Sequence, residues 1–186
     1  MAPRLRTTVI AAVLALSCFV PMGWHIATQA IGAKDKVISV TDSEVRLWVL
    51  RLHPGDDLVD SIKKFASQHS IEAGSIVTCV GSLDHARLRY ANQSDYENLD
   101  SKGRHFEIVS FVGTFSTTSH HLHLAIANEK GTVFGGHASS GNRVYTTAEI
   151  VIADGLSWEF QRERDPQTTY KELSPIPRRR ATGDAR

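Results

Sequence analysis

The feature that most constrains the fold is a succession of short segments rich in β-branched and aromatic residues, each closed by turn residues. Segments of this composition are typical of β-strands. Because they follow one another at short intervals, neighbouring strands are expected to pair as hairpins and to run antiparallel. The expected strands span 75–81, 86–91, 106–115, 120–127, 132–137, 144–152 and 157–162.

One further strand and one helix precede this succession. In residues 44–53 (EVRLWVLRLH) successive side chains would point to opposite faces of a strand, and both faces carry apolar residues. This pattern predicts a strand that is covered on both sides. Apolar residues then recur every three or four positions up to His69, with Asp56 or Asp57 as the N-cap, which predicts an amphipathic helix. The predicted fold class is α+β: a single, mostly antiparallel β-sheet of about seven or eight strands covered by one α-helix.

The 186 residues suffice for one ordinary domain with tails. We expect the domain at 43–173, between an N-terminal leader at 1–33 and a basic disordered tail at 174–186. The polar stretch 92–103 is expected to be a surface loop.

The leader contains an uncharged, mostly apolar stretch at 7–24, preceded by two arginines. This arrangement is typical of a secretory signal, with a weakly marked cleavage after Ala30. The same stretch can anchor an uncleaved chain in a bilayer, although Pro21 interrupts it. A basic, acid-free start also suits mitochondrial import, and residues 15–18 (ALSC) resemble a lipoprotein signal. We favour a secretory or membrane-anchored chain, with mitochondrial import as the alternative and membrane contact through the leader only.

The net charge of the folded part does not favour binding to nucleic acid. The chain has 21 Lys and Arg against 20 Asp and Glu. Without the two leader arginines, and without the four arginines and one aspartate of 178–186, 15 basic and 19 acidic side chains remain. Such a balance does not attract phosphate backbones. The basic tail can touch nucleic acid, but it lacks the Arg-Gly-Arg-Pro core of an AT-hook.

Several common chemistries are excluded or not indicated. Cys79 is the only cysteine outside the leader, so no intramolecular disulfide can form in the domain, and its apolar neighbours predict a buried thiol. The chain has no nucleophile elbow, phosphate loop or dinucleotide fingerprint. The sequence does not identify a catalytic residue.

Four of the nine histidines crowd into residues 120–137. In a strand, His121 and His123 point to the same face, and His120 points to the other. Residues 128–132 (NEKGT) suit a hairpin with a three-residue loop and Gly131 in the left-handed conformation. Residues whose numbers sum to 260 then pair, which places His137 opposite His123 on the same face.

Three converging imidazoles are the usual start of a zinc or related transition-metal site, with a fourth position open to water, a carboxylate or another ligand. We therefore predict that His121, His123 and His137 bind a metal, with Zn²⁺ first. A His-x-His pair also occurs on strands that merely face solvent. The third histidine at the matching position of the neighbouring strand favours the metal.

Three further features bear on this site. Gly135 and Gly136, just before His137, would let a backbone or a ligand come close, unless they form a bulge that ends the strand. Glu107 and Glu149 interrupt apolar strands, so each can support a histidine, add a fourth ligand or act as a general base. A salt bridge to a nearby arginine is the commoner role of such a glutamate.

The order of these motifs resembles the PPC domain, the plant-and-prokaryote-conserved family, from about Val45 to Leu173. The resemblance is carried by LHPGDDL at 52–58, VGSL at 80–83, FEIVSFVGTF at 106–115, HLHL at 121–124, GTVFGGH at 131–137, TTAEIVI at 146–152 and RDPQTTYKEL at 164–173. It implies one helix against an antiparallel sheet, assembled as a homotrimer. In bacterial-type members the histidines matching His121, His123 and His137 look like a metal site.

Plant members place the domain after AT-hooks in nuclear DNA-binding regulators, where a Gly-Arg-Phe-Glu-Ile-Leu stretch supports partner contacts. Here residues 103–108 (GRHFEI) carry an extra His105, and no AT-hook exists. The first hypothesis is a homotrimeric module with a three-histidine zinc site and a small-molecule ligand; as an enzyme, it would use metal-activated water for hydrolysis. The alternative is a DNA-associated or partner-binding regulator. A purely structural trimer with solvated histidines is the third reading. The resemblance supplies no enzymatic activity.

Overall fold

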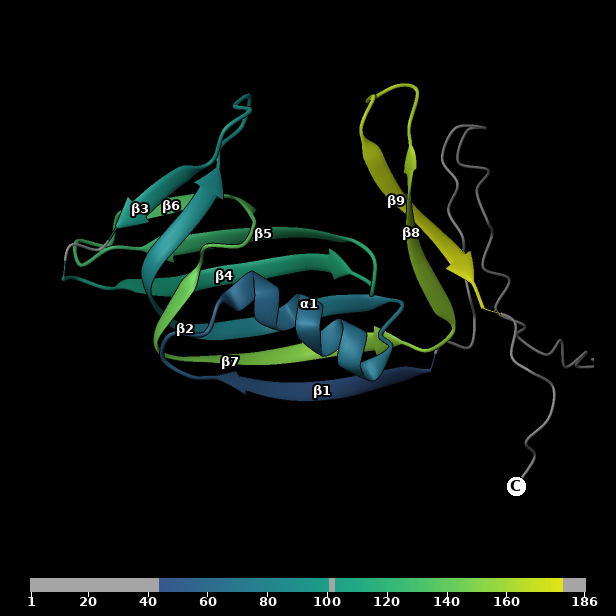
Figure 1. Cartoon of the computed structure of the whole chain (residues 1–186), viewed down its shortest axis with the longest axis horizontal. Coiled ribbons are helices and arrows are strands. Elements are labelled where there is room, and N and C mark those ends of the chain that lie inside the picture. Colours follow the sequence, from purple (N-terminus) through teal and green to yellow (C-terminus); the bar gives the residue numbers. More distant parts are fainter. Residues whose placement is uncertain (1–43, 101–102, 179–186) are drawn as a thin grey trace, which may run out of the picture. The chain divides into compact units, whose positions relative to one another are not determined.

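The computed structural model describes residues 44–100 and 103–178. The elements are β1 (Val45–Leu52), α1 (Leu58–His69), β2 (Gly74–Arg89), β3 (Glu97–Asp100), β4 (Phe106–Phe115), β5 (His120–Ala127), β6 (Val133–Ala138), β7 (Arg143–Gly155), β8 (Trp158–Arg164) and β9 (Lys171–Pro177). Seven strands form one antiparallel sheet in the order β1-β7-β2-β4-β5-β6, with β3 paired to β2 (Figure 1). The predicted α+β fold is confirmed. β8 and β9 form a separate two-stranded sheet.

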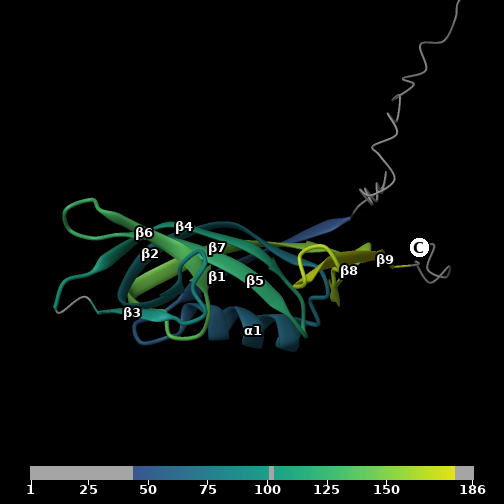
Figure 2. The same cartoon turned by 90° about the horizontal axis from the view of Figure 1, so that it is seen from above.

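The single described helix, α1, lies on one face of the sheet (Figure 2). Its sequence fixes both ends: the side chain of Asp57 accepts a hydrogen bond from the Asp60 N–H, and Ser70 ends the helix in the left-handed conformation. Within the described parts of the chain, no helix is long and apolar enough to cross a membrane.

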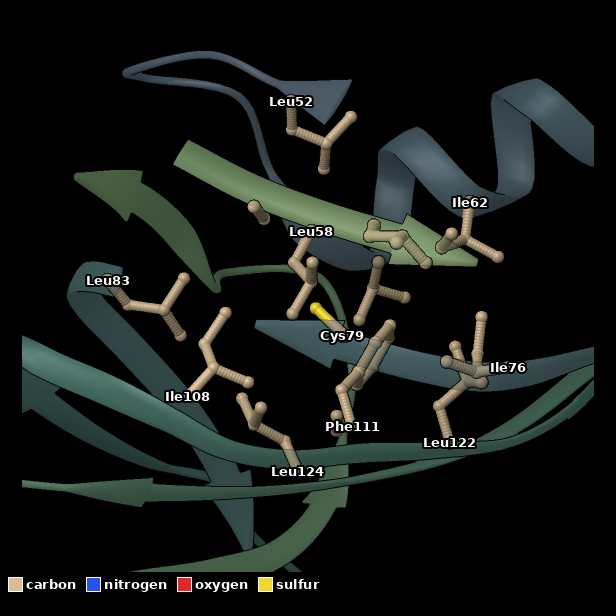
Figure 3. Close-up of a cluster of buried hydrophobic side chains, with 14 of the residues drawn as sticks. Leu52, Leu58, Ile62, Ile76, Cys79, Leu83, Ile108, Phe111, Leu122 and Leu124 are labelled. Atoms are coloured by element: carbon tan, nitrogen blue, oxygen red, sulfur yellow. The ribbon is translucent and has the colours of Figure 1, made fainter. Parts of the chain in front are cut away.

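The core fills the space between α1 and the sheet (Figure 3). Each fully buried aliphatic or aromatic side chain there stabilises the fold by about 1.5–3 kcal/mol. Cys79 is buried among these side chains, as its neighbours predict. The core includes Leu58 and Ile62 from α1, Ile76 and Leu83 from β2, Ile108 and Phe111 from β4, and Leu122 and Leu124 from β5.

Asp57 also joins α1 to the loop before β7. Its second carboxylate oxygen accepts hydrogen bonds from the backbone N–H groups of Gly141, at 2.7 Å, and Asn142, at 2.8 Å. Asn142 is fully buried, and its side-chain oxygen accepts a hydrogen bond from the Arg87 N–H at 3.0 Å. This network satisfies polar groups that would otherwise be buried without partners.

Residues 74–89 form one long strand, β2, where the sequence predicts two strands, 75–81 and 86–91, separated by turn residues. The chain bends here instead of reversing. Gly81 has a φ of 144°, and a Cβ there would lie 2.0 Å from the Thr147 carbonyl oxygen, so the glycine permits close approach to β7. Register shifts on both sides of Leu83 bend the strand further, as β-bulges do.

Two other segments also differ from expectation. The polar stretch 92–103 contains the short strand β3, and residues 174–177, expected in the tail, belong to β9. The leader and residues 179–186 lie outside the described residues.

β1 is covered on one face only, where Trp48 packs edge-on against Phe65 of α1 with ring centroids 5.5 Å apart. Its other face is exposed: Leu47 is 64% and Val49 83% accessible in the single chain. That side of the sheet, opposite α1, is called the outer face below.

Candidate metal centre

The hairpin of β5 and β6 positions the histidine cluster. The Asn128 N–H donates to the Thr132 carbonyl oxygen at 3.0 Å, and Gly131 takes a φ of 75°. His123 and His137 are therefore direct partners across the strands, which confirms the predicted register. One stabilising feature was not predicted: the Asn128 side-chain oxygen accepts from the N–H groups of Lys130 and Thr132 and so orders the loop.

The three predicted histidines converge. The Nε2 atoms of His121 and His123 lie 3.1 Å apart, and one ring nitrogen from each of the three residues lies within 4.8 Å of the others. Tetrahedral Zn²⁺ with bonds of 2.0–2.1 Å separates its nitrogen ligands by about 3.4 Å. Small ring rotations bring the three nitrogens to that spacing, so the group can hold a metal ion. Imidazole donors suit zinc, copper, iron and nickel.

The electrostatics favour the neutral imidazole at His121 and His137. Burial, followed by the charge of Arg89 and the neighbouring histidines, lowers the pKa of His137 to about 4. Partial desolvation and the neighbouring His123 also lower the pKa of His121, although its side chain remains exposed on the surface. A metal needs the unprotonated ring nitrogen, so at neutral pH little proton competition opposes binding.

Two glycines let neighbouring backbones approach the cluster. A Cβ on Gly113 of β4 would lie 2.0 Å from the carbonyl oxygen of His121, and Gly113 has a φ of 139°. A Cβ on Gly136 would lie 2.6 Å from the carbonyl oxygen of Arg89. The sequence predicts a close approach of another backbone or a ligand at residues 135–136. In the structure the approaching backbone is the end of β2, and Arg89 therefore lies opposite His137.

Glu107 and Glu149 are exposed, and neither is among the residues whose ligand atoms form the cluster. Glu107 pairs with Ala127, four residues along β5 from His123, a separation of about 13 Å along the strand. Glu149 lies on β7, opposite Arg51 and Val80.

His120 interacts electrostatically with Asp60 and Lys63 of α1, consistent with its predicted direction away from the other three histidines. Sequence reasoning missed Arg89 and Arg162. Arg162 of β8 donates from Nη2 to the Thr114 hydroxyl at 3.0 Å, so it reaches β4 beside His121. The pairing of Arg89 with His137 follows from the register of β2 and β6, and no local pattern marks the docking of β8.

Residues 40–155 match the model of the Plants and Prokaryotes Conserved (PCC) domain. The chain belongs to this family. The matched residues contain all three histidines of the cluster and end before β8. The resemblance noted in the sequence is thereby confirmed.

Relatives of this PCC domain include a bifunctional protein GlmU of Synechococcus sp. (strain JA-3-3Ab), which is 39% identical over 151 residues. The match covers 81% of this chain and 23% of that protein, so the chain spans about a quarter of the length of the curated relatives it matches.

Among solved structures, a hypothetical protein from Salmonella is 36% identical, with a TM-score of 0.71, over 74% of this chain and 97% of that one. A metal-containing protein from Archaeoglobus fulgidus is 27% identical, with a TM-score of 0.60, over 74% of this chain and 99% of that one.

Proposed function

We propose that this PCC domain protein is a homotrimeric metal-binding protein whose His121, His123 and His137 hold Zn²⁺ beside a small-molecule ligand. The observation that carries the proposal is the convergence of three imidazole nitrogens within 4.8 Å of one another. Support also comes from the similar Archaeoglobus fulgidus protein, which is described as metal-containing.

The exposure of the three histidines suits a site that small molecules in solution can reach. His121 and His123 are exposed and His137 is half-buried. Three protein ligands leave a coordination position free, which distinguishes catalytic and ligand-binding zinc sites from closed structural ones. Bound zinc would supply Lewis-acid chemistry, and hydrolysis is the reaction class that this favours. The chain's own histidines would orient the metal from two rigid, paired strands.

The outer face supports self-association. Exposed apolar side chains lie on β1, β2 and β4 of this face, and a patch of this kind commonly marks a protein interface. A second copy of the chain is the occupant that we propose, because the family resemblance implies a trimer. On these three strands the exposed apolar residues are Val45, Leu47 and Val49 on β1, Val77 and Val80 on β2, and Val109 and Val112 on β4.

Metal content tests the metal site. The full chain, purified without chelator or affinity histidines, should contain about one metal per chain by inductively coupled plasma mass spectrometry. His123→Ala should lose it, because two imidazoles hold zinc weakly. The matched control is His120→Gln, a neighbour on the same strand outside the cluster, which should retain the metal. Unchanged metal stoichiometry in His123→Ala would refute the site.

Sedimentation equilibrium tests the trimer separately. Val80→Asp should dissociate it, because a carboxylate would be buried in an apolar interface without a partner. Tyr170→Asp adds the same charge at an exposed position on the loop between β8 and β9 and should leave the trimer intact. A wild-type chain that sediments as a monomer would disprove the assembly and leave the metal site untouched.

A further inference from the structure

A cavity of about 520 Å³ opens directly beside the histidine cluster. Its volume falls within the range of small-molecule sites, about 300–1,000 Å³. Two of the three clustered histidines line it. The other side chains on which the inference rests come from the end of β2 and from the β8–β9 hairpin: Arg89, Arg162, Lys171 and Glu172.

The cavity is positioned by the main sheet and by the hairpin, which lies beyond the end of the sheet where β5 begins (Figure 1). Backbone hydrogen bonds fix the base of the hairpin: the Phe160 N–H donates to the Glu72 carbonyl oxygen at 2.8 Å, and the Gly155 N–H donates to that of Ala73 at 2.9 Å. Further along β8, the Arg162 side chain donates a hydrogen bond to the Thr114 hydroxyl of β4.

Positive charge dominates the lining. Arg89, Arg162 and Lys171 line the cavity together with one carboxylate, Glu172. Within residues 44–100 and 103–178, the ion pairs that the structure shows involve none of these three cations. Glu172 accepts a hydrogen bond from the Thr168 hydroxyl at 2.9 Å and acts on Arg162 only at longer range. The cavity therefore keeps a surplus of about two positive charges.

Arg89 and Arg162 are also held in place. Arg89 lies opposite His137 in the sheet and donates from Nη1 to the Gln93 carbonyl oxygen at 3.2 Å. Arg162 is half-buried, and burial lowers the pKa of its guanidinium, which nevertheless stays charged at neutral pH. Each guanidinium has five N–H donors, so one hydrogen bond to the protein leaves donors for a ligand.

We propose that this cavity binds the oxyanion group, a carboxylate or a phosphate, of a small molecule, with Arg89 and Arg162 as the residues that hold it. Planar guanidinium groups match both anions through paired hydrogen bonds. The inference deepens the proposed function and rests on it, because a metal on the three histidines would add positive charge beside the same cavity. The arginines belong to the chain itself, so the anion site can be tested with and without metal.

Isothermal titration calorimetry on the full chain tests the site, with inorganic phosphate and succinate as probes and the metal content of each sample measured. Arg89→Gln and Arg162→Gln should each raise the Kd of the bound probe about tenfold or more, the effect of losing a charge-assisted hydrogen bond. Arg162→Lys keeps the charge and should lie between. Arg164→Gln makes the same charge change two residues along β8, outside the cavity lining, and should stay within about twofold of wild type.

The outcomes separate the two proposals. Arginine-dependent binding of phosphate alone, or of succinate alone, supports the site and identifies the anion. Metal-loaded protein that binds neither probe, or binds with no dependence on either arginine, overturns the anion site and leaves the metal centre standing. Arginine-dependent binding in a chain that takes up no metal supports the anion site and overturns the metal centre. Circular dichroism of each variant confirms that it is folded.

Discussion

Replacing Gly113 of β4 by alanine should destabilise the pairing of β4 with β5, the strand that carries His121. The added Cβ would lie 2.0 Å from the His121 carbonyl oxygen and 2.9 Å from the Leu122 Cα, so β4 must move from β5 by about 1 Å. The φ of 139° adds backbone strain of about 1–3 kcal/mol. Weakened hydrogen bonds between the strands add about 1 kcal/mol each. Together these effects lower the free energy of unfolding by about 3–5 kcal/mol.

Urea unfolding followed by circular dichroism, at one fixed protein concentration, measures this loss. The control is Gly131→Ala: Gly131 also has a positive φ, of 75°, but no atom lies within 4 Å of an added Cβ. This control isolates backbone strain, and we expect it to cost about 1 kcal/mol. If the two variants lose equal stability, the close approach of β4 to β5 is not what requires glycine at 113. Gly113→Ala should also bind metal more weakly, since it displaces the His121 backbone.

Three other predictions use different parts of the structure. Asp57→Ala removes acceptors for three backbone N–H groups and should cost about 2–4 kcal/mol in urea unfolding, with Asp57→Asn losing less. In a Cys18→Ser background, Cys79 should not react with a thiol reagent until urea unfolds the chain, because burial raises the pKa of its thiol to about 12. The pKa of His137 falls from 6.5 to about 4 on folding, so the unfolded chain binds the proton more readily in this window. The free energy of unfolding of the metal-free protein should therefore fall as the pH is lowered from 6.5 to about 4, by about 1–2 kcal/mol after solvent screening. His137→Gln should abolish this part of the dependence of unfolding free energy on pH.

Rules of hairpin geometry and side-chain alternation were sufficient to predict the histidine cluster from the sequence. A three-residue loop with glycine at its last position fixes the pairing of the strands that it joins, and side chains alternate along each strand. These two facts place His123 opposite His137 without knowledge of the rest of the fold. The helix was similarly predictable from its periodicity and from the aspartate cap at Asp57.

Other elements could not be predicted, for identifiable reasons. Gly81 and Ser82 are turn residues by composition, but here glycine admits a neighbouring backbone and the strand continues. β9 contains Pro175 and Pro177, residues that argue against a strand unless it lies at an edge, as in this two-stranded sheet. The position of Arg162 beside the cluster depends on a contact with Thr114, 48 residues away in the chain, and no local pattern encodes it.

The proposed metal centre and the proposed trimer interface are physically connected on the outer face. Val112, which is 46% exposed, pairs directly with His123 in the register of β4 and β5. A cavity of about 250 Å³ is lined by Val112 together with His121 and His123. A second copy that covers Val112 would therefore reduce the water around His123 and strengthen electrostatic interactions at the cluster. If both proposals hold, metal affinity and trimer stability must depend on each other, because any free energy that metal binding gains in the trimer equally stabilises the trimer when metal is bound.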